Sequence, residues 1–279
     1  MKLLMYLKRA LWCIKNGPTV IKHTTADIHY LNPDNKLAGK KIIITGGGRG
    51  LGYAMAKKFV SEGADVLIAG RNEDLLAEKA NELNCKYLKL DVQNSSEFDK
   101  FIEQAHKLLG GVNCLVNNAG ISLHEGEIRN VTEEQFDSQI STNLKGGYFL
   151  AQKFIKYFEN SRQEYGNILF VSSERGFFTD DLPYGLTKAA VNSLIKGLAY
   201  RLVGNHIRVN GIAPGVTTSD MTAFKADGNL YAPWNTGERV YLPEEVAEVA
   251  CFLLSDAANC LSGQILECNN GKTANTHWR

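Results

Sequence analysis

A tyrosine and a lysine stand four residues apart in this chain, at Tyr184 and Lys188. On a helix this spacing places both side chains on one face, within reach of each other. Two opposite unit charges about 4 Å apart attract by roughly 4 kcal/mol at an effective dielectric constant near 20, before any cost of desolvation. A lysine ammonium would therefore lower the pKa of the phenol, while burial would raise it. The pair predicts a tyrosine that exchanges a proton with a carbonyl oxygen near neutral pH.

A glycine-rich turn at residues 45–52 lies far upstream, after a short β-branched segment and before a helical pattern. In that context glycines let the backbone approach a pyrophosphate, whose charge the amide groups at a helix N-terminus stabilise. The spacing of Gly46, Gly50 and Gly52 is G-x-x-x-G-x-G and differs from the common G-x-G-x-x-G fingerprint. A lone glycine cluster would also fit a tight turn, so the motif depends on what accompanies it.

The elements that must position these residues alternate along the chain. Short apolar runs are found at 40–45, 65–69, 85–90, 112–117, 167–172, 206–211 and 264–268. Helical patterns lie between them at 51–62, 73–83, 96–109, 133–158, 184–203 and 243–254. This alternation predicts an α/β fold, with a single doubly wound, Rossmann-type, seven-stranded parallel sheet and helices on both faces. We expect one domain, residues 40–279, preceded by an N-terminal arm, residues 1–39.

Five motifs in this order resemble the signature of the short-chain dehydrogenase/reductase family, in its compact branch. They are residues 45–52, 117–120, 171–173, 184–188 and 207–215. The resemblance covers about residues 38–271. It implies hydride transfer between a nicotinamide cofactor and a carbonyl or secondary alcohol.

The resemblance also implies four catalytic residues. Tyr184 is similar to the acid/base of the family, and Lys188 to the lysine that binds the nicotinamide ribose and tunes the phenol. Ser173 resembles the serine that hydrogen-bonds the substrate oxygen, and Asn143 the asparagine that helps to hold a relay water. Ser172 remains an alternative to Ser173, which stands about two positions closer to the tyrosine than is usual, across a charged loop. Asn143 could instead satisfy helix backbone groups.

The cofactor implied is NADP(H). Where an NAD enzyme of the family usually carries an acid after the second strand, this chain has Gly70 and then Arg71. Arg71 and Arg49 suit a 2′-phosphate, because arginine binds phosphate bidentately; the alternative is that both are surface residues. The expected cofactor-binding set is Gly46, Gly48, Arg49, Gly50, Leu51, Gly52, Arg71, Asp91, Val92, Asn118, Ala119, Gly120, Tyr184, Lys188, Pro214, Gly215, Val216 and Thr218.

Composition excludes several other classes. A net charge of +1 gives no basic field for nucleic acid. The six histidines and six cysteines show no metal-ligand spacing, so we expect no metal site. The cysteines, several of them within apolar runs, favour free thiols in a reducing compartment and hence a cytoplasmic protein. No apolar run is long enough to span a membrane.

Two segments outside the regular pattern invite hypotheses. Residues 217–240 are predicted to form a substrate lid, in which Trp234 stacks on a substrate ring or anchors the lid to the body. The N-terminal arm carries an amphipathic helix with an apolar face of Leu3, Leu4, Leu7, Leu11 and Ile14. We expect this face to pack against protein. Its basic residues leave a membrane surface as the alternative.

The sequence therefore favours an NADP(H)-dependent oxidoreductase acting on a small molecule. The resemblance further implies a homotetramer or homodimer, paired through helices 133–158 and 184–203. Charges in the Ser–Tyr loop suggest a polar substrate and the lid aromatics an apolar one, so the substrate stays open. Two alternatives are a non-catalytic dinucleotide-binding regulatory protein and a sugar-nucleotide-modifying enzyme of the extended branch. The latter has different glycine spacing and a larger C-terminal region.

Overall fold

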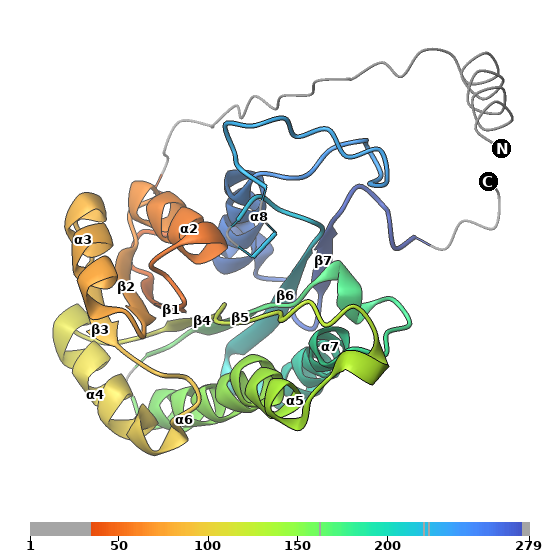
Figure 1. The fold of residues 1–279 in the computed structure, drawn as a ribbon. Coiled ribbons are helices and arrows are strands. Elements are labelled where there is room, and N and C mark those ends of the chain that lie inside the picture. Colours follow the sequence, from red (N-terminus) through yellow and green to blue (C-terminus); the bar gives the residue numbers. More distant parts are fainter. Residues whose placement is uncertain (1–34, 162, 220, 223, 275–279) are drawn as a thin grey trace, which may run out of the picture.

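The computed structural model describes residues 35–161, 163–219, 221–222 and 224–274. It is a three-layer sandwich in which helices cover both faces of a parallel sheet (Figure 1). The seven strands lie in the order β3-β2-β1-β4-β5-β6-β7, and every neighbouring pair is parallel. The predicted fold class is confirmed. The amphipathic helix expected near the N-terminus lies outside the described residues.

The strands and helices follow the expected alternation closely. The strands are β1 (Lys41–Thr45), β2 (Asp65–Gly70), β3 (Lys86–Lys89), β4 (Cys114–Asn117), β5 (Gly166–Val171), β6 (Ile207–Pro214) and β7 (Ile265–Cys268). The α-helices are α2 (Gly50–Ser61), α3 (Glu73–Leu83), α4 (Phe98–Leu109), α5 (Glu133–Gln139), α6 (Gly147–Glu159), α7 (Pro183–Arg201) and α8 (Pro243–Leu254).

The sheet separates two hydrophobic cores, because alternate side chains of a strand point to opposite faces. On β1, Ile42 and Ile44 contribute to the core beneath α2, α3 and α8. Ile43 contributes to the core beneath α4, α6 and α7. Leu37, which the sequence analysis placed in the arm, is fully buried in the first of these cores. Residues 35–39 therefore pack against the body of the domain.

The predicted helix 133–158 is not continuous. A π-helical segment, Ile140–Gly146, separates α5 from α6 and carries Asn143. Such wider turns are uncommon and occur frequently at functional sites. The sequence pattern predicted the overall span but not the interruption, because it indicates which residues face the core and not which carbonyl each backbone N–H bonds.

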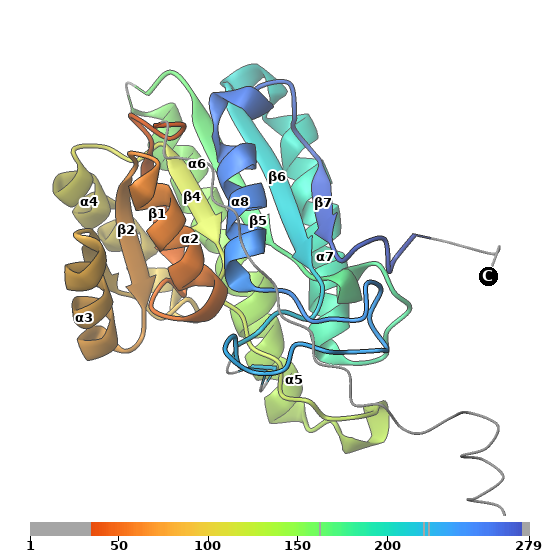
Figure 2. The same cartoon turned by 90° about the horizontal axis from the view of Figure 1, so that it is seen from above.

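The expected lid is an irregular loop in its described residues. Isolated bridges pair Thr217 with Tyr241 and Tyr231 with Arg239, instead of regular strands. The loop has a small core of its own, made by Leu230, Ala232, Val240 and Leu242. Figure 2 shows the lid, in blue, at the same end of the sheet as α5.

Candidate active site

A cavity of about 820 Å³ opens at the carboxyl ends of the strands, around the point where the strand order reverses between β1 and β4. Doubly wound sheets bind their ligands at this place. Seventeen of the eighteen expected cofactor residues line it, namely Gly46, Gly48, Arg49, Gly50, Leu51, Gly52, Arg71, Asp91, Val92, Asn118, Ala119, Gly120, Tyr184, Lys188, Pro214, Gly215 and Thr218. The eighteenth, Val216, packs instead against the core of the lid.

Hydrogen bonds fasten the glycine-rich turn to the segment after β4. The Thr45 hydroxyl accepts from the backbone N–H groups of Asn118 and Ala119, at 3.0 and 3.1 Å. The Asn118 amide group donates to the carbonyls of Thr45 and Gly46, at 2.9 and 3.1 Å. A Cβ atom on Gly52 would overlap the Gly46 carbonyl. The turn is thus held with its backbone facing the cavity, which is the cradle that a pyrophosphate needs.

Thr45 is a site residue that the sequence analysis passed over. It lines the cavity, and its side chain is buried between β1 and β4. The sequence pattern could have indicated it, because Thr45 is a hydroxyl residue at the end of the first strand, directly before the glycines. Ile121, Ser122, Leu123, Met221 and Thr222 also line the cavity, on the side toward the lid.

Asn143 lies just behind the cavity and does not line it. Its carboxamide oxygen accepts from the Ile121 N–H at 2.8 Å, and its nitrogen donates to the Ile121 carbonyl at 2.9 Å and to the Thr187 hydroxyl at 3.3 Å. The π-helical segment is thereby tied both to the loop after β4 and to α7. The side chain bonds other segments of the fold, rather than the backbone of its own helix.

The structure separates the roles of the two neighbouring serines. Ser172 lines the cavity too, but its hydroxyl is buried and donates to the Asn192 side-chain oxygen at 2.5 Å. The Ser173 hydroxyl instead accepts from the Arg175 N–H at 3.2 Å and lies near enough to Tyr184 to lower the pKa of its phenol. This geometry favours Ser173 as the serine that contacts the reacting oxygen.

Burial dominates the electrostatics of the Tyr184–Lys188 pair. Lys188 is only 4 % exposed; its Nζ donates to the Val171 carbonyl at 2.8 Å and lies 5.5 Å from the centre of the Tyr184 ring. Desolvation lowers the pKa of Lys188 to about 8. Desolvation also raises the pKa of Tyr184 above 10, against the Ser173 hydrogen bond and the positive charge of Arg175. The lowering of this pKa that the sequence analysis expected from Lys188 is therefore not found.

An ion pair bridges the short loop between Ser173 and Tyr184. The Arg175 guanidinium donates to both carboxylate oxygens of Asp180, at 2.5 and 2.7 Å. Asp180 is nearly buried and also accepts from the Leu182 N–H at 3.1 Å, just before α7 begins. Arg175 and Asp180 are thus paired with each other, so their charges are weak evidence for a polar substrate.

The two arginines expected to bind the cofactor, Arg49 and Arg71, line the cavity from different segments of the chain. Arg49 precedes α2 and Arg71 follows β2, and both are exposed residues that line it. Asn72, next to Arg71, caps α3 by accepting from the Leu75 N–H at 3.1 Å. An NADP(H) molecule fits this set, with a glycine cradle for the pyrophosphate and guanidinium groups for a 2′-phosphate.

Within the described residues, no group of three or more His, Cys, Asp or Glu side chains is arranged to hold a metal ion. The same part of the chain contains no helix with the length and apolar character needed to cross a membrane.

Comparison with known proteins places the chain in a family. Residues 46–273 match the family model described as enoyl-(acyl carrier protein) reductase. The 3-oxoacyl-[acyl-carrier-protein] reductase of Aquifex aeolicus is 31% identical over 246 residues, covering 85% of this chain and 98% of that protein. The Chlamydia pneumoniae protein of the same description is 34% identical over 254 residues, covering 86% and 99%.

Solved structures agree. A short-chain type dehydrogenase/reductase from Mycobacterium marinum has a TM-score of 0.78 at 28% identity, covering 86% of this chain and 98% of its own. The 3-ketoacyl-(acyl-carrier-protein) reductase of Brucella melitensis, complexed with NADH, has a TM-score of 0.78 at 30% identity, covering 85% and 99%. The chain belongs to the short-chain dehydrogenase/reductase family.

These matches confirm the expected enzyme class, an NADP-dependent oxidoreductase acting on CH–OH or C=O groups. The relatives match over almost their full length, which agrees with the compact branch. The strength of the preference for NADPH over NADH remains a prediction.

Proposed function

We propose that the chain reduces a carbonyl compound with NADPH, with Tyr184 as the acid/base. The observation that carries this proposal is the meeting of Ser173, Tyr184 and Lys188 in one cavity with the glycine-rich turn. The Ser173 hydroxyl also lies near enough to the phenol of Tyr184 to lower its pKa, which supports a shared role at one substrate oxygen. A cradle for the cofactor and a proton donor for the substrate thus share one space.

The chain's own residues would divide the work as follows. When bound, the cofactor supplies or accepts the hydride. Ser173 donates a hydrogen bond to the substrate oxygen, and Tyr184 gives that oxygen a proton during reduction. The raised pKa of Tyr184 suits this direction, because the phenol stays protonated at neutral pH. Lys188, held by the Val171 carbonyl, is placed to bind the nicotinamide ribose.

A relay of protons to Tyr184 would pass near Asn143. The amide nitrogen of Asn143 already donates to Ile121 and Thr187. A water bound here would therefore donate a hydrogen bond to the carboxamide oxygen of Asn143, which has a second lone pair, or to the main-chain carbonyl of Asn143. We propose that Asn143 mainly shapes the π-helical segment, and that the water is held by acceptor atoms.

The relatives suggest a substrate class. Several of them are described as 3-oxoacyl-[acyl-carrier-protein] reductases. We propose a 3-oxoacyl thioester as the first compound to test. The lid side of the cavity offers Leu123 and Met221 for an acyl chain, which favours this class over a sugar.

The experiment is to follow NADPH oxidation with a panel of carbonyl compounds that includes a 3-oxoacyl thioester, a sugar and a simple ketone. We expect turnover with the thioester that disappears in Tyr184→Phe. Tight binding of NADPH without turnover on any compound would instead support a non-catalytic regulatory protein.

We also propose a cytoplasmic homo-oligomer. The free cysteines Cys85, Cys114, Cys251, Cys260 and Cys268 agree with a reducing compartment. Tyr148 on α6 and Leu186 on α7 are 46% and 45% exposed, so these two helices offer apolar surface for pairing. Light scattering at micromolar concentration should give a dimer or a tetramer, and a monomer would contradict the proposal.

A further inference from the structure

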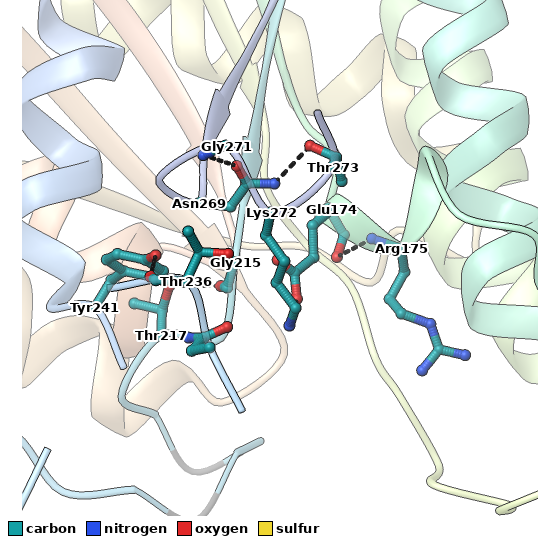
Figure 3. Close-up of polar contacts among 12 residues, drawn as sticks. Glu174, Arg175, Gly215, Thr217, Thr236, Tyr241, Asn269, Gly271, Lys272 and Thr273 are labelled. Carbon is teal, nitrogen blue, oxygen red and sulfur yellow. Dashed lines mark hydrogen bonds and ion pairs between the residues drawn. The ribbon is translucent and has the colours of Figure 1, made fainter. Parts of the chain in front are cut away.

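Glu174 directly follows the proposed substrate-binding serine, yet its carboxylate does not line the cavity. It points instead toward the last turn of the described chain, while the neighbouring Arg175 points the other way (Figure 3). The Glu174 side chain is 5% exposed, and its Oε1 accepts from the Lys272 ammonium at 2.8 Å. Its Oε2 is buried and has no hydrogen-bond partner among the described residues.

Such a carboxylate is costly to bury, and the proposed reaction does not use it. Taking an ion out of water costs several kcal/mol even after the protein relaxes. A single ammonium at 2.8 Å and an unsatisfied second oxygen offset this cost only in part. A hydrophobic residue would satisfy packing at this place with less penalty, so a role beyond stability is needed.

The carboxylate lies where several segments meet. A Cβ atom on Gly215, which lines the cavity, would stand 3.1 Å from Glu174 Oε2, 2.8 Å from the Tyr241 ring and 3.1 Å from the Asn269 side chain. Tyr241 follows the lid, and Asn269 begins the turn after β7. The segment after β6, the lid, the C-terminal turn and the serine loop therefore all touch around one glycine (Figure 3).

The C-terminal turn, residues 269–274, is held by its own hydrogen bonds. Asn269 Oδ1 accepts from the Gly271 N–H at 3.0 Å, and its Nδ2 donates to the Thr273 hydroxyl at 2.8 Å. The Lys272 N–H donates to the Asn269 carbonyl at 3.2 Å. These bonds fix the point from which the Lys272 side chain reaches the serine loop.

The lid rests on this turn in two places. The Lys272 ammonium lies 5.3 Å from the centre of the Trp234 ring, within the range of a cation–π interaction. A Cβ atom on Gly237 would stand 2.7 Å from the side-chain nitrogen of Asn270, so lid and turn are in close contact there as well. One ammonium thus touches both the lid aromatic and the carboxylate beside the catalytic serine.

We propose that Glu174 and Lys272 are positioning residues: their ion pair couples the seat of the lid, at Trp234, to the orientation of Ser173. The coupling has a short path, because Ser173 caps the helical turn Glu174–Gly176 through its hydroxyl. Loss of the Lys272 charge leaves the Glu174 carboxylate buried and unpaired. The turn then shifts to expose that carboxylate and carries the Ser173 hydroxyl away from Tyr184. This inference rests on the proposed role of Ser173.

The test uses the full chain and the variants Lys272→Met, Lys272→Arg and Glu174→Gln/Lys272→Met. For Lys272→Met we expect kcat to fall at least ~10-fold and the substrate KM to rise, with NADPH affinity within about 2-fold of wild type. Lys272→Arg keeps the charge and should restore most of the activity. The double variant buries no unpaired charge, so it should recover kcat in part while the substrate KM stays high. It also carries the measurement if Lys272→Met alone fails to fold.

The matched control is Lys40→Met. Lys40 also forms an ion pair, with Asp256 at 2.6 Å, but it precedes β1, at the end of the sheet opposite the cavity. We expect this variant to keep wild-type kcat and KM. If Lys40→Met and Lys272→Met lost activity equally, the loss would reflect general destabilisation, and the proposal would be overturned.

A second readout does not depend on turnover. In a Trp12→Phe/Trp278→Phe background, Trp234 is the only tryptophan of the chain. Lys272→Met should increase its quenching by acrylamide, because the lid loses its anchor. If no carbonyl compound is reduced, the proposed function fails, while this measurement still decides whether Lys272 seats the lid. Unchanged quenching, or unchanged kcat and KM, in Lys272→Met would overturn the proposed positioning role of the Glu174–Lys272 ion pair.

Discussion

Asp180 lies directly against Gly185: a Cβ atom on Gly185 would overlap the Asp180 carboxylate. Gly185 is the residue after Tyr184, and Asp180 is the ion-pair partner of Arg175, two residues after Ser173. The hydroxyls of Ser173 and Tyr184, to which we assign the catalytic roles, are therefore held in place by one clamp, which spans the loop between them. The loop between Ser173 and Tyr184 is short, and for that reason the sequence alone did not distinguish Ser173 from Ser172. The same short loop brings Asp180 into direct contact with Gly185.

The first prediction concerns that clamp. Gly185→Ala should displace Asp180 and with it Arg175, and lower kcat by at least ~10-fold while NADPH affinity is kept. Steady-state kinetics and a cofactor titration measure both quantities. The control is Gly197→Ala in the same helix, where an added Cβ meets nothing within 4 Å. That variant should be fully active and slightly more stable. A Gly185→Ala enzyme with wild-type kcat would show that the clamp does not position the site.

The second prediction concerns the phenol. Tyr184→Phe removes only the oxygen that carries the proton, so turnover should fall at least ~100-fold. NADPH affinity should change little, since the glycine turn and Lys188 are untouched. A variant that retains wild-type turnover on the true substrate would exclude Tyr184 as the acid/base.

The third prediction concerns the choice of cofactor. NADPH should bind at least ten-fold more tightly than NADH, about 1.4 kcal/mol, which is modest for one charge-assisted phosphate contact. Arg71→Asp should weaken NADPH binding and leave NADH binding nearly unchanged. Titrating both cofactors against both proteins gives the comparison, and equal affinities in the wild type would contradict it.

The fourth prediction concerns pH and Lys188. Burial lowers the pKa of Lys188 from 10.5 to about 8, so the folded protein releases this proton more readily than the unfolded chain. Below about pH 8 Lys188 is charged in both the folded and the unfolded protein, so the full cost of burying its ammonium lowers the stability. Between about pH 8 and 10.5 the unfolded state holds more protons, and stability rises with pH.

The measurement is urea unfolding of wild type and Lys188→Met from pH 7 to 10.5. The free energy of unfolding of wild type should gain on that of the variant by about 2–3 kcal/mol across this range. Taking the difference cancels groups that titrate in both proteins. A difference independent of pH would mean that Lys188 is not strongly desolvated.

The sequence by itself determined the architecture and most of the cofactor site. Apolar runs alternating with helical patterns predict a parallel sheet with helices on both faces, because each strand must be covered on both faces. The glycine-rich turn, residues 117–120 and Pro214–Gly215 each lie at or just after a strand end. Parallel strands end at the same edge of the sheet, so these segments were bound to converge on one cavity.

Only the tertiary structure decided how the catalytic groups are held and charged. Our preference for Ser173 over Ser172 rests on neighbours 11 to 20 residues away, Tyr184 and Asn192. The raised pKa of Tyr184 depends on how much water the surrounding segments exclude, which no local spacing reveals. The contact between Glu174 and Lys272 joins residues 98 positions apart. Local patterns specify which elements form, whereas burial and long-range pairing appear only when those elements pack together.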